Sequence, residues 1–175
     1  MYAGHVGVAL GAHGIRKAVP LWLLIIASQL PDWADAGLCL ANVRTPVPGI
    51  YSHSLPAIGV LALAAAIAYC FMVRDVAGML LVAAVVASHA VGDFFTGMKP
   101  TWNGGPMIGL QLYQHPVIDF AVEAMVLVAG WLLYRRSFPE DRRSSAPVLT
   151  VLGALLAIQA GADIVLSFAR GLKKC

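Results

Sequence analysis

Residues 54–73 read SLPAIGVLALAAAIAYCFMV, twenty consecutive positions without a charged side chain. A helix needs about 20 apolar residues to cross the hydrocarbon core of a bilayer, so this stretch predicts a membrane span. The rest of the chain is similar, because 59% of its 175 residues are hydrophobic, 12% are charged and the mean hydropathy is +0.78. Soluble domains are roughly half apolar and a quarter charged. The sequence therefore predicts an integral membrane protein.

Five further apolar stretches on either side of residues 54–73 predict an all-α, polytopic bundle of about six hydrophobic helices, the first two short. Charged or Pro- and Gly-rich segments separate them. The predicted helices cover residues 2–14, 18–30, 54–73, 76–95, 117–134 and 147–169. The connections 31–52 and 96–114 are predicted to be irregular loops, the second a lid over a site. The length suits one domain, 1–175.

Charge and cysteine usage exclude several classes of protein. The net charge is only +3 and the basic residues lie near predicted helix ends, which suits membrane lipids as partners and not nucleic acid. Cys39, Cys70 and Cys175 are far apart, which predicts buried apolar thiols and neither a disulfide framework nor a thiolate zinc site. The start of the chain lacks a basic region, so no signal peptide is expected.

Two further sequence patterns concern orientation and packing. Lysine and arginine are more frequent in the turns 15–17, 74–75 and 135–145 than on the opposite side, which predicts that the loops 31–52 and 96–116 lie outside the cytoplasm. Ala3, Gly7 and Gly11 recur every four residues. Small residues at this spacing line one face of a helix and let its backbone come close to another helix in lipid, so they predict a helix-packing face.

Two His–Asp pairs lie where a bilayer penalises ionisable groups. His89 and Asp93 are four residues apart near the end of one predicted helix, and His115 and Asp119 repeat the spacing at the start of the next. Residues four apart share a helix face, and Pro116 suits the first helical position, which places His115 near the cap. Such groups cost roughly 3 kcal/mol at membrane depth unless they are paired or metal-bound. Each pair is therefore a candidate site.

Tracing the predicted crossings brings further polar residues to the same membrane face. Imidazole and carboxylate without thiolate are typical of a hydrolytic zinc site and also suit Mn²⁺ or Fe²⁺. The predicted metal ligands, for one to three zinc ions, are His5, Asp32, His53, His89, Asp93, His115 and Asp119. The residues expected to support these ligands or hold a phosphate or the membrane surface are Asp35, Glu123, Arg44 and Lys99.

Simpler interpretations stay open beside the metal site. A His–Asp pair can be a buried hydrogen bond, Asp32 or Asp35 can cap a helix, and His5 can lie at a frayed terminus. Stacked histidines and carboxylates also line ion pathways, so a metal-ion or proton-coupled transporter is the alternative to an enzyme. A structural membrane subunit, which would bind no metal, is the third possibility.

At these positions the chain resembles the YdjM-like family of bacterial inner-membrane proteins, which are described as predicted metal-dependent hydrolases. The matching elements are His5, Pro31-Asp32 with Asp35, Ser52-His53-Ser54, and His89 to Asp93 with Thr96. The ligand order is also similar to that of zinc-dependent phospholipase C and P1 nuclease: His5, Asp32, His53, His89 with Asp93, then His115 with Asp119.

The resemblance implies a multi-pass protein of the bacterial inner membrane that hydrolyses a phosphoester. The expected substrate is a phospholipid or a lipid-linked molecule, cleaved by metal-activated water on the extracytoplasmic side. Asp32 is expected to orient that water or accept its proton. Neither the natural substrate nor an oligomeric state follows from these patterns.

Overall fold

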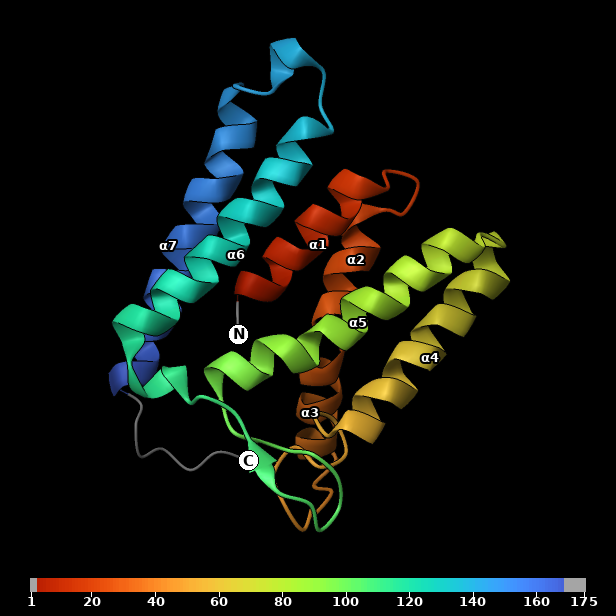
Figure 1. Ribbon diagram of the computed structural model, residues 1–175, viewed down its shortest axis with the longest axis vertical. Helices are drawn as coiled ribbons and strands as arrows, with labels where there is room; N and C mark the ends of the chain where they lie inside the picture. The colour runs from red at the N-terminus through yellow and green to blue at the C-terminus, as the bar shows by residue number, and fades with distance from the viewer. Residues whose placement is uncertain (1–2, 169–175) are drawn as a thin grey trace. The chain divides into compact units, whose positions relative to one another are not determined.

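The computed structural model describes residues 3–168, and its regular structure is almost entirely helical (Figure 1). The elements are α1 Ala3–Ile15, α2 Leu21–Ser28, α3 Leu30–Leu40, α4 Leu55–Val73, α5 Val76–Thr96, β1 Lys99–Pro100, β2 Met107–Ile108, η1 Leu112–Gln114, α6 Pro116–Arg136, η2 Glu140–Arg142 and α7 Ala146–Phe168. The predicted all-α class is confirmed. The predicted helix ends at Tyr2 and Ala169, and Cys175, lie outside the described residues.

Four helices are long and apolar enough to cross a membrane: α4, α5, α6 and α7, with mean hydropathies of 1.7 to 2.2. The shorter α2 and α3 bend by 57° at their junction and form either a broken span or a re-entrant loop, which gives up to five spans among the described residues. The membrane-protein character predicted from the sequence is therefore supported. A sixth span is not shown.

Both predicted loops contain regular structure. The sequence predicts an irregular loop over 31–52, but α3 occupies its first part, with Pro31 in the first turn. A proline there disturbs nothing, because an N–H in the first helical turn has no partner within the helix. The second loop contains an antiparallel pair in which Lys99 lies opposite Ile108. Gly109, at φ 145°, passes so close to the Gly97 backbone that no side chain would fit.

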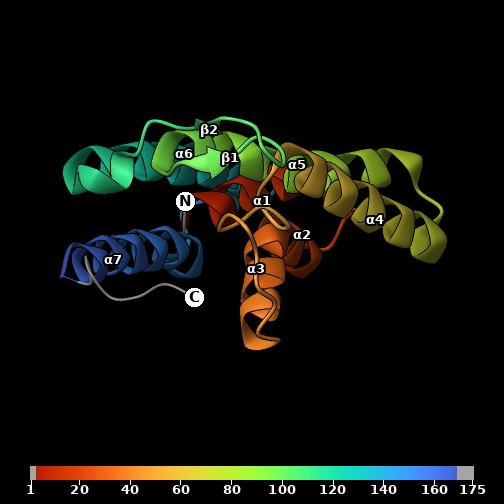
Figure 2. The same ribbon diagram turned by 90° about the horizontal axis from the view of Figure 1, so that it is seen from below.

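The chain divides into two compact units. Of the described residues, 3–25 and 112–168 form the first unit and 26–111 form the second. In the first unit α1 lies along α6, and α7 packs against both as a separate layer (Figure 2). In the second unit α4 and α5 form an antiparallel hairpin from which α3 projects. The single domain expected from the length stays a prediction.

Glycines bring the backbones of α1 and α6 together in the first unit. A Cβ added at Gly7 would lie 2.9 Å from the Leu127 Cα, and one at Gly11 would lie 3.3 Å from the Gly130 Cα. Small residues permit this approach, which supplies close van der Waals contact between helices in lipid. The packing face predicted from residues four apart is confirmed for Gly7 and Gly11.

The second unit joins its β-hairpin to two helix ends. The Leu55 N–H, at the start of α4, donates to the Thr101 carbonyl at 3.0 Å. The Leu110 N–H donates to the Phe94 carbonyl, near the end of α5, at 2.7 Å. The hairpin is therefore held over the end of the α4–α5 pair.

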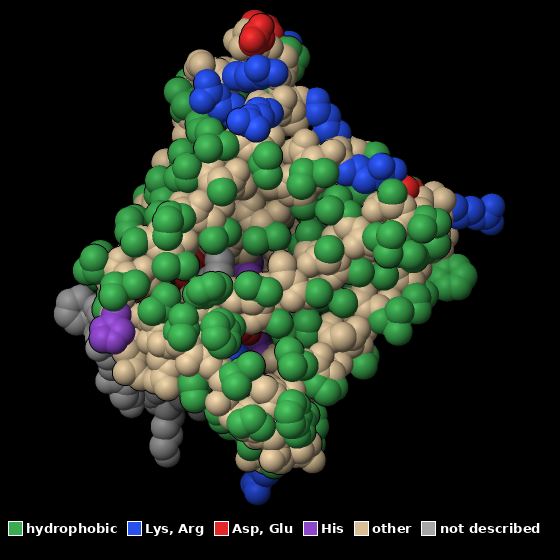
Figure 3. Space-filling view, viewed as in Figure 1, with side chains coloured by type: hydrophobic (Ala, Val, Ile, Leu, Met, Phe, Trp, Pro, Cys, Tyr) green, Lys and Arg blue, Asp and Glu red, His purple; other side chains and the backbone are tan. Residues whose placement is uncertain are grey.

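The surface along the long helices is apolar, as expected for helices surrounded by lipid. Large apolar side chains such as Phe71 and Val117 are exposed on the spans, and Figure 3 shows hydrophobic side chains along the helix sides with Lys and Arg gathered at the α6–α7 turn. Cys70 is free and only half-buried, whereas Cys39 is disulfide-bonded. The prediction of buried apolar thiols is therefore wrong for Cys39, because cysteine spacing says nothing of which thiols meet in space.

Candidate metal centre

The second unit brings four of the seven predicted ligands together. Asp32 lies in the first turn of α3, His53 directly precedes the Ser54 cap of α4, and His89 and Asp93 share one face of α5. Both histidines and Asp93 are buried, and His89 is 0% exposed. The Asp32 side chain keeps 45% of its surface exposed. Three segments separated along the chain therefore meet at one cluster that solvent reaches beside Asp32.

The distances within this cluster suit one small divalent ion. The Nε2 of His53 lies 3.1 Å from the Asp32 Oδ1 and 3.6 Å from the Asp93 Oδ2. The Nε2 of His89 lies 3.6 Å and 3.4 Å from the same two oxygens. Four ligand atoms placed tetrahedrally at the usual zinc distance of about 2.0–2.1 Å would be about 3.3–3.4 Å apart. The donor set and these four distances are therefore compatible with zinc, and Asp32, His53 and His89 each offer a ligand atom within 4.8 Å of the other two.

Hydrogen bonds on the far side of the His53 ring fix which nitrogen faces the cluster. The Ser52 hydroxyl donates to the Asp35 carboxylate at 2.8 Å, so its oxygen accepts from the His53 Nδ1 at 2.8 Å. An imidazole that carries its proton on Nδ1 presents a lone pair on Nε2. The Asp35–Ser52–His53 chain therefore turns a metal-ligating nitrogen toward Asp32 and Asp93.

His89 is oriented in the same way by a backbone group. Its Nδ1 lies 2.9 Å from the Ser28 carbonyl oxygen, which can only accept, so Nδ1 carries the proton. The Nε2 lone pair then faces the Asp32 and Asp93 carboxylates. Two lone pairs and two carboxylate oxygens repel one another unless positive charge lies among them. The Lys99 ammonium, 3.6 Å from the Asp93 Oδ2, supplies part of that charge, and a divalent cation or protons on the rings would supply the rest.

Asp32 also lies within hydrogen-bonding distance of one of the cluster histidines. Its Oδ1 is 3.1 Å from the His53 Nε2. A carboxylate must be deprotonated to bind a metal, and the Asp32 carboxylate is the group of the cluster that solvent reaches.

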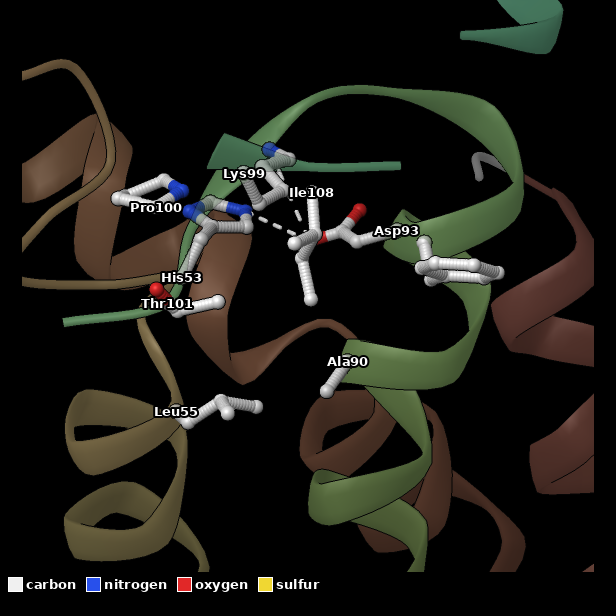
Figure 4. Close-up of a pocket in the computed structure, with 9 residues that line it drawn as sticks. His53, Leu55, Ala90, Asp93, Lys99, Pro100, Thr101 and Ile108 are labelled. Carbon is white, nitrogen blue, oxygen red and sulfur yellow. Dashed lines mark ion pairs between the residues drawn. The ribbon is translucent and has the colours of Figure 1, made fainter. Parts of the chain in front are cut away.

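A small cavity adjoins the cluster. Its volume is about 20 Å³, enough for one water molecule. It is lined by His53, Leu55, Ala90, Asp93, Phe94, Lys99, Pro100, Thr101 and Ile108. Figure 4 shows the His53 ring and the Lys99 ammonium both directed at the Asp93 carboxylate, which the Lys99 Nζ approaches to 3.6 Å. The β1–β2 hairpin, which lies in the loop 96–114 predicted to be a lid, thus forms one wall of this cavity and brings the Lys99 ammonium to it.

The other predicted ligands lie in the first unit. His5 is buried in α1, and His115 is the exposed N-cap of α6, as the His-Pro sequence predicts. Asp119 is buried in the first turn of α6, and the Glu123 Oε2 accepts from the Gly4 N–H at 3.0 Å. The participation of His5, His115 and Asp119 in one cluster with His53 stays a prediction.

Several groups that support the cluster were not predicted from the sequence. Arg44, expected to hold a phosphate, is exposed in the connection between α3 and α4. No role of its own was predicted for Ser52, although a serine next to a candidate histidine indicates a hydroxyl that can orient the imidazole ring. No sequence pattern predicts the bond to the Ser28 carbonyl, because this backbone group is 61 residues from His89 and meets it only in the folded chain.

Comparisons with known proteins add no family. No protein-family model, curated protein or solved structure matches this chain. The resemblance to the YdjM-like family stays a prediction. The function is therefore argued from the residues of the cluster.

Replacing Ser52 by alanine is expected to weaken zinc binding by roughly 10- to 100-fold, because the His53 ring loses the hydroxyl that sets its proton position. The measurement is competition for zinc against a chromophoric chelator in detergent. Ser88→Ala is the matched control, since the Ser88 hydroxyl donates to Val85 within its own helix. Equal zinc affinities for Ser52→Ala and the wild type would contradict the orienting role.

Proposed function

We propose that the protein is a membrane-bound metal-dependent hydrolase that holds at least one zinc ion through Asp32, His53, His89 and Asp93. The observation that carries the proposal is the set of four N–O distances of 3.1 to 3.6 Å between two imidazoles and two carboxylates. The two carboxylates would balance the charge of one divalent ion, and the two imidazoles would complete its set of protein ligands. Mn²⁺ and Fe²⁺ suit the same donors.

The substrate class that we propose is a phosphoester. When bound, a zinc ion lowers the pKa of a water molecule to about 7 and offsets charge on a phosphoryl oxygen. The cavity beside His53 and Asp93 has room for the water. Asp32, the most exposed of the four carboxylate and imidazole groups, has a second oxygen with which to orient that water or take its proton. The Lys99 ammonium at the cavity wall would bind a phosphoryl oxygen.

Exposed apolar side chains beside the cavity support a lipid or lipid-linked substrate. Trp102, Met107, Ile108 and Leu110 of the hairpin region are all exposed. Tryptophan favours the membrane–water interface, where a phosphoester headgroup lies. Asp32, His53 and Asp93 lie at or near helix ends, and His89 lies in the second half of α5, one turn before Asp93, which favours an interfacial enzyme over a transporter. The inner membrane and its extracytoplasmic side are the proposed location.

The test is zinc analysis of the purified protein combined with hydrolysis of a phosphodiester and of a short-chain phospholipid in detergent. We expect about one or more zinc ions per chain, loss of turnover after chelation and its return with Zn²⁺. Chelation should also lower the unfolding temperature, because a ligand that binds only the folded state stabilises it. Metal flux in liposomes without turnover, or turnover indifferent to chelation, would refute the hydrolase.

A further inference from the structure

Positive charge is concentrated at one end of the first unit, where α1 and α6 finish and α7 begins (Figure 3). The segments 15–17 and 135–145 contain six basic side chains and only two acidic ones. The two segments meet because α1 and α6 run parallel, and the Lys17 ammonium donates to the Ser137 carbonyl. The basic residues, here called the basic end, are Arg16, Lys17, Arg135, Arg136, Arg142 and Arg143.

Only part of this charge has a use inside the protein. The Lys17 ammonium is held by a carbonyl, and the Arg143 guanidinium donates to the Phe138 carbonyl at 3.1 Å and lies 3.8 Å from the Glu140 carboxylate. Basic groups near a helix C-terminus also offset the helix dipole. Arg136 and Arg142, in contrast, are exposed, and their side chains form no ion pair with an acidic residue among residues 3–168. Two guanidinium groups are therefore available to an anion from outside the chain.

A third guanidinium of the basic end is held in place. The Arg135 Cζ lies 5.4 Å from the centroid of the Trp131 ring, and its Nη2 donates to the Ser144 hydroxyl at 3.2 Å. The Trp131 ring is itself fixed, because its Nε1 donates to the Val148 carbonyl at 2.8 Å. These contacts join the end of α6 to the start of α7, so the connection that carries Arg142 is anchored on both sides.

An apolar groove on α6 leads toward the basic end. Its volume is about 350 Å³. It is lined by Ala121, Ala124, Met125, Val128, Ala129 and Leu132. Residues three and four apart share a helix face, and Arg136 follows Leu132 by four, so the same face of α6 continues from apolar side chains to a guanidinium. A phospholipid has the same order, from its acyl chains to its phosphate.

We propose that the first unit binds an anionic phospholipid of the surrounding bilayer, with its headgroup at Arg136 and Arg142 and an acyl chain in the α6 groove. Guanidinium groups bind phosphate through paired N–H donors, and the excess of positive charge selects an anionic headgroup over a zwitterionic one. The turns of this end are those predicted from Lys and Arg counts to face the cytoplasm, where anionic lipids make the membrane surface negative. The site uses none of the four residues proposed for zinc, and it does not depend on the hydrolase proposal.

The test compares the binding of dioleoyl phosphatidylglycerol and dioleoyl phosphatidylcholine to the full-length protein in detergent by native mass spectrometry. The acyl chains are the same, so a preference for phosphatidylglycerol reports on the headgroup. Each Lys or Arg near an anionic surface contributes a factor of roughly five in affinity, so Arg136→Gln and Arg142→Gln should each weaken phosphatidylglycerol binding about fivefold. Arg74→Gln, which removes the same charge from the exposed α4–α5 turn, is the matched control and should leave the affinity unchanged. His89→Ala should also leave it unchanged while losing zinc, which separates this proposal from the hydrolase.

Two further measurements test the groove and the source of the phosphate. Ala129→Phe fills the groove and should weaken the binding of both lipids, whereas Ala154→Phe, at an exposed position of α7 outside the groove, should not. Glycerol 3-phosphate, which has the phosphate without acyl chains, should bind the wild type much more weakly than phosphatidylglycerol. Equal affinities of the wild type for the two lipids, equal losses in Arg74→Gln and Arg136→Gln, or glycerol 3-phosphate binding as tight as that of the lipid would each overturn the proposal.

Discussion

Replacing His89 by alanine is expected to abolish zinc binding and hydrolysis together while the helices stay folded. The Nε2 of His89 lies 3.4 Å and 3.6 Å from the two carboxylates, and its Nδ1 is held by the Ser28 carbonyl. Loss of a supporting hydrogen bond to a metal ligand costs roughly 10- to 100-fold in affinity, so loss of the ligand itself should cost more. Zinc content, zinc affinity and phosphodiester turnover would be measured on the same detergent preparation.

The matched control for His89→Ala is His13→Ala. His13 also bonds a backbone carbonyl through Nδ1, that of Val19 at 2.9 Å, but it lies at the far end of α1 from His5. This variant should keep wild-type zinc content and turnover. His115→Ala then decides between a four-ligand centre and the larger set predicted from the sequence, because only the larger set requires His115. A His89→Ala protein that keeps stoichiometric zinc would exclude the proposed centre.

Replacing Gly130 by valine should disrupt the first unit. A Cβ at Gly130 would overlap the Gly7 carbonyl, which is backbone and has no rotamer through which to move away. Overpacking usually costs about 1–3 kcal/mol and occasionally more, and a clash between two backbones belongs at the upper end. We expect a loss of about 3 kcal/mol or more in the free energy of unfolding, measured by thermal or detergent-induced unfolding.

Gly153→Val provides the comparison for this loss. Gly153 lies on α7, and a Cβ added there would meet no atom within 4 Å. The same change of residue type should therefore alter stability little. If Gly130→Val and Gly153→Val unfold at the same temperature, the close packing of α1 against α6 is not what holds the first unit together.

Much of the architecture could be predicted because its causes are local. An uncharged run such as residues 54–73 can satisfy its backbone in lipid only as a helix or in a closed barrel, and α4 covers this run from Leu55 to Val73. The spacing of His89 and Asp93 places them on one helix face, and both point to the same cluster. His115 caps α6 because Pro116 occupies its first position.

Other features could not be predicted because they depend on contacts far apart in sequence. Pro31 signals a turn as readily as a helix start, and only the structure shows α3 beginning there. The strands of the hairpin have two residues each, too few for a periodic pattern. The Asp35–Ser52 bond and the Ser28 carbonyl are supports for the two imidazoles that no local pattern encodes.

Local sequence patterns are enough to indicate a membrane protein, its long apolar helices and the candidate ligands, because hydrophobic length and helical period depend on neighbouring residues. The use of the two identical His–Asp spacings becomes visible in the folded protein alone. His89 is buried with its ring held by the Ser28 carbonyl, whereas His115 is exposed at a helix cap and Asp119 is buried in the first unit. The cause is physical: spacing sets the direction of a side chain on its own helix, but its neighbours come from other helices.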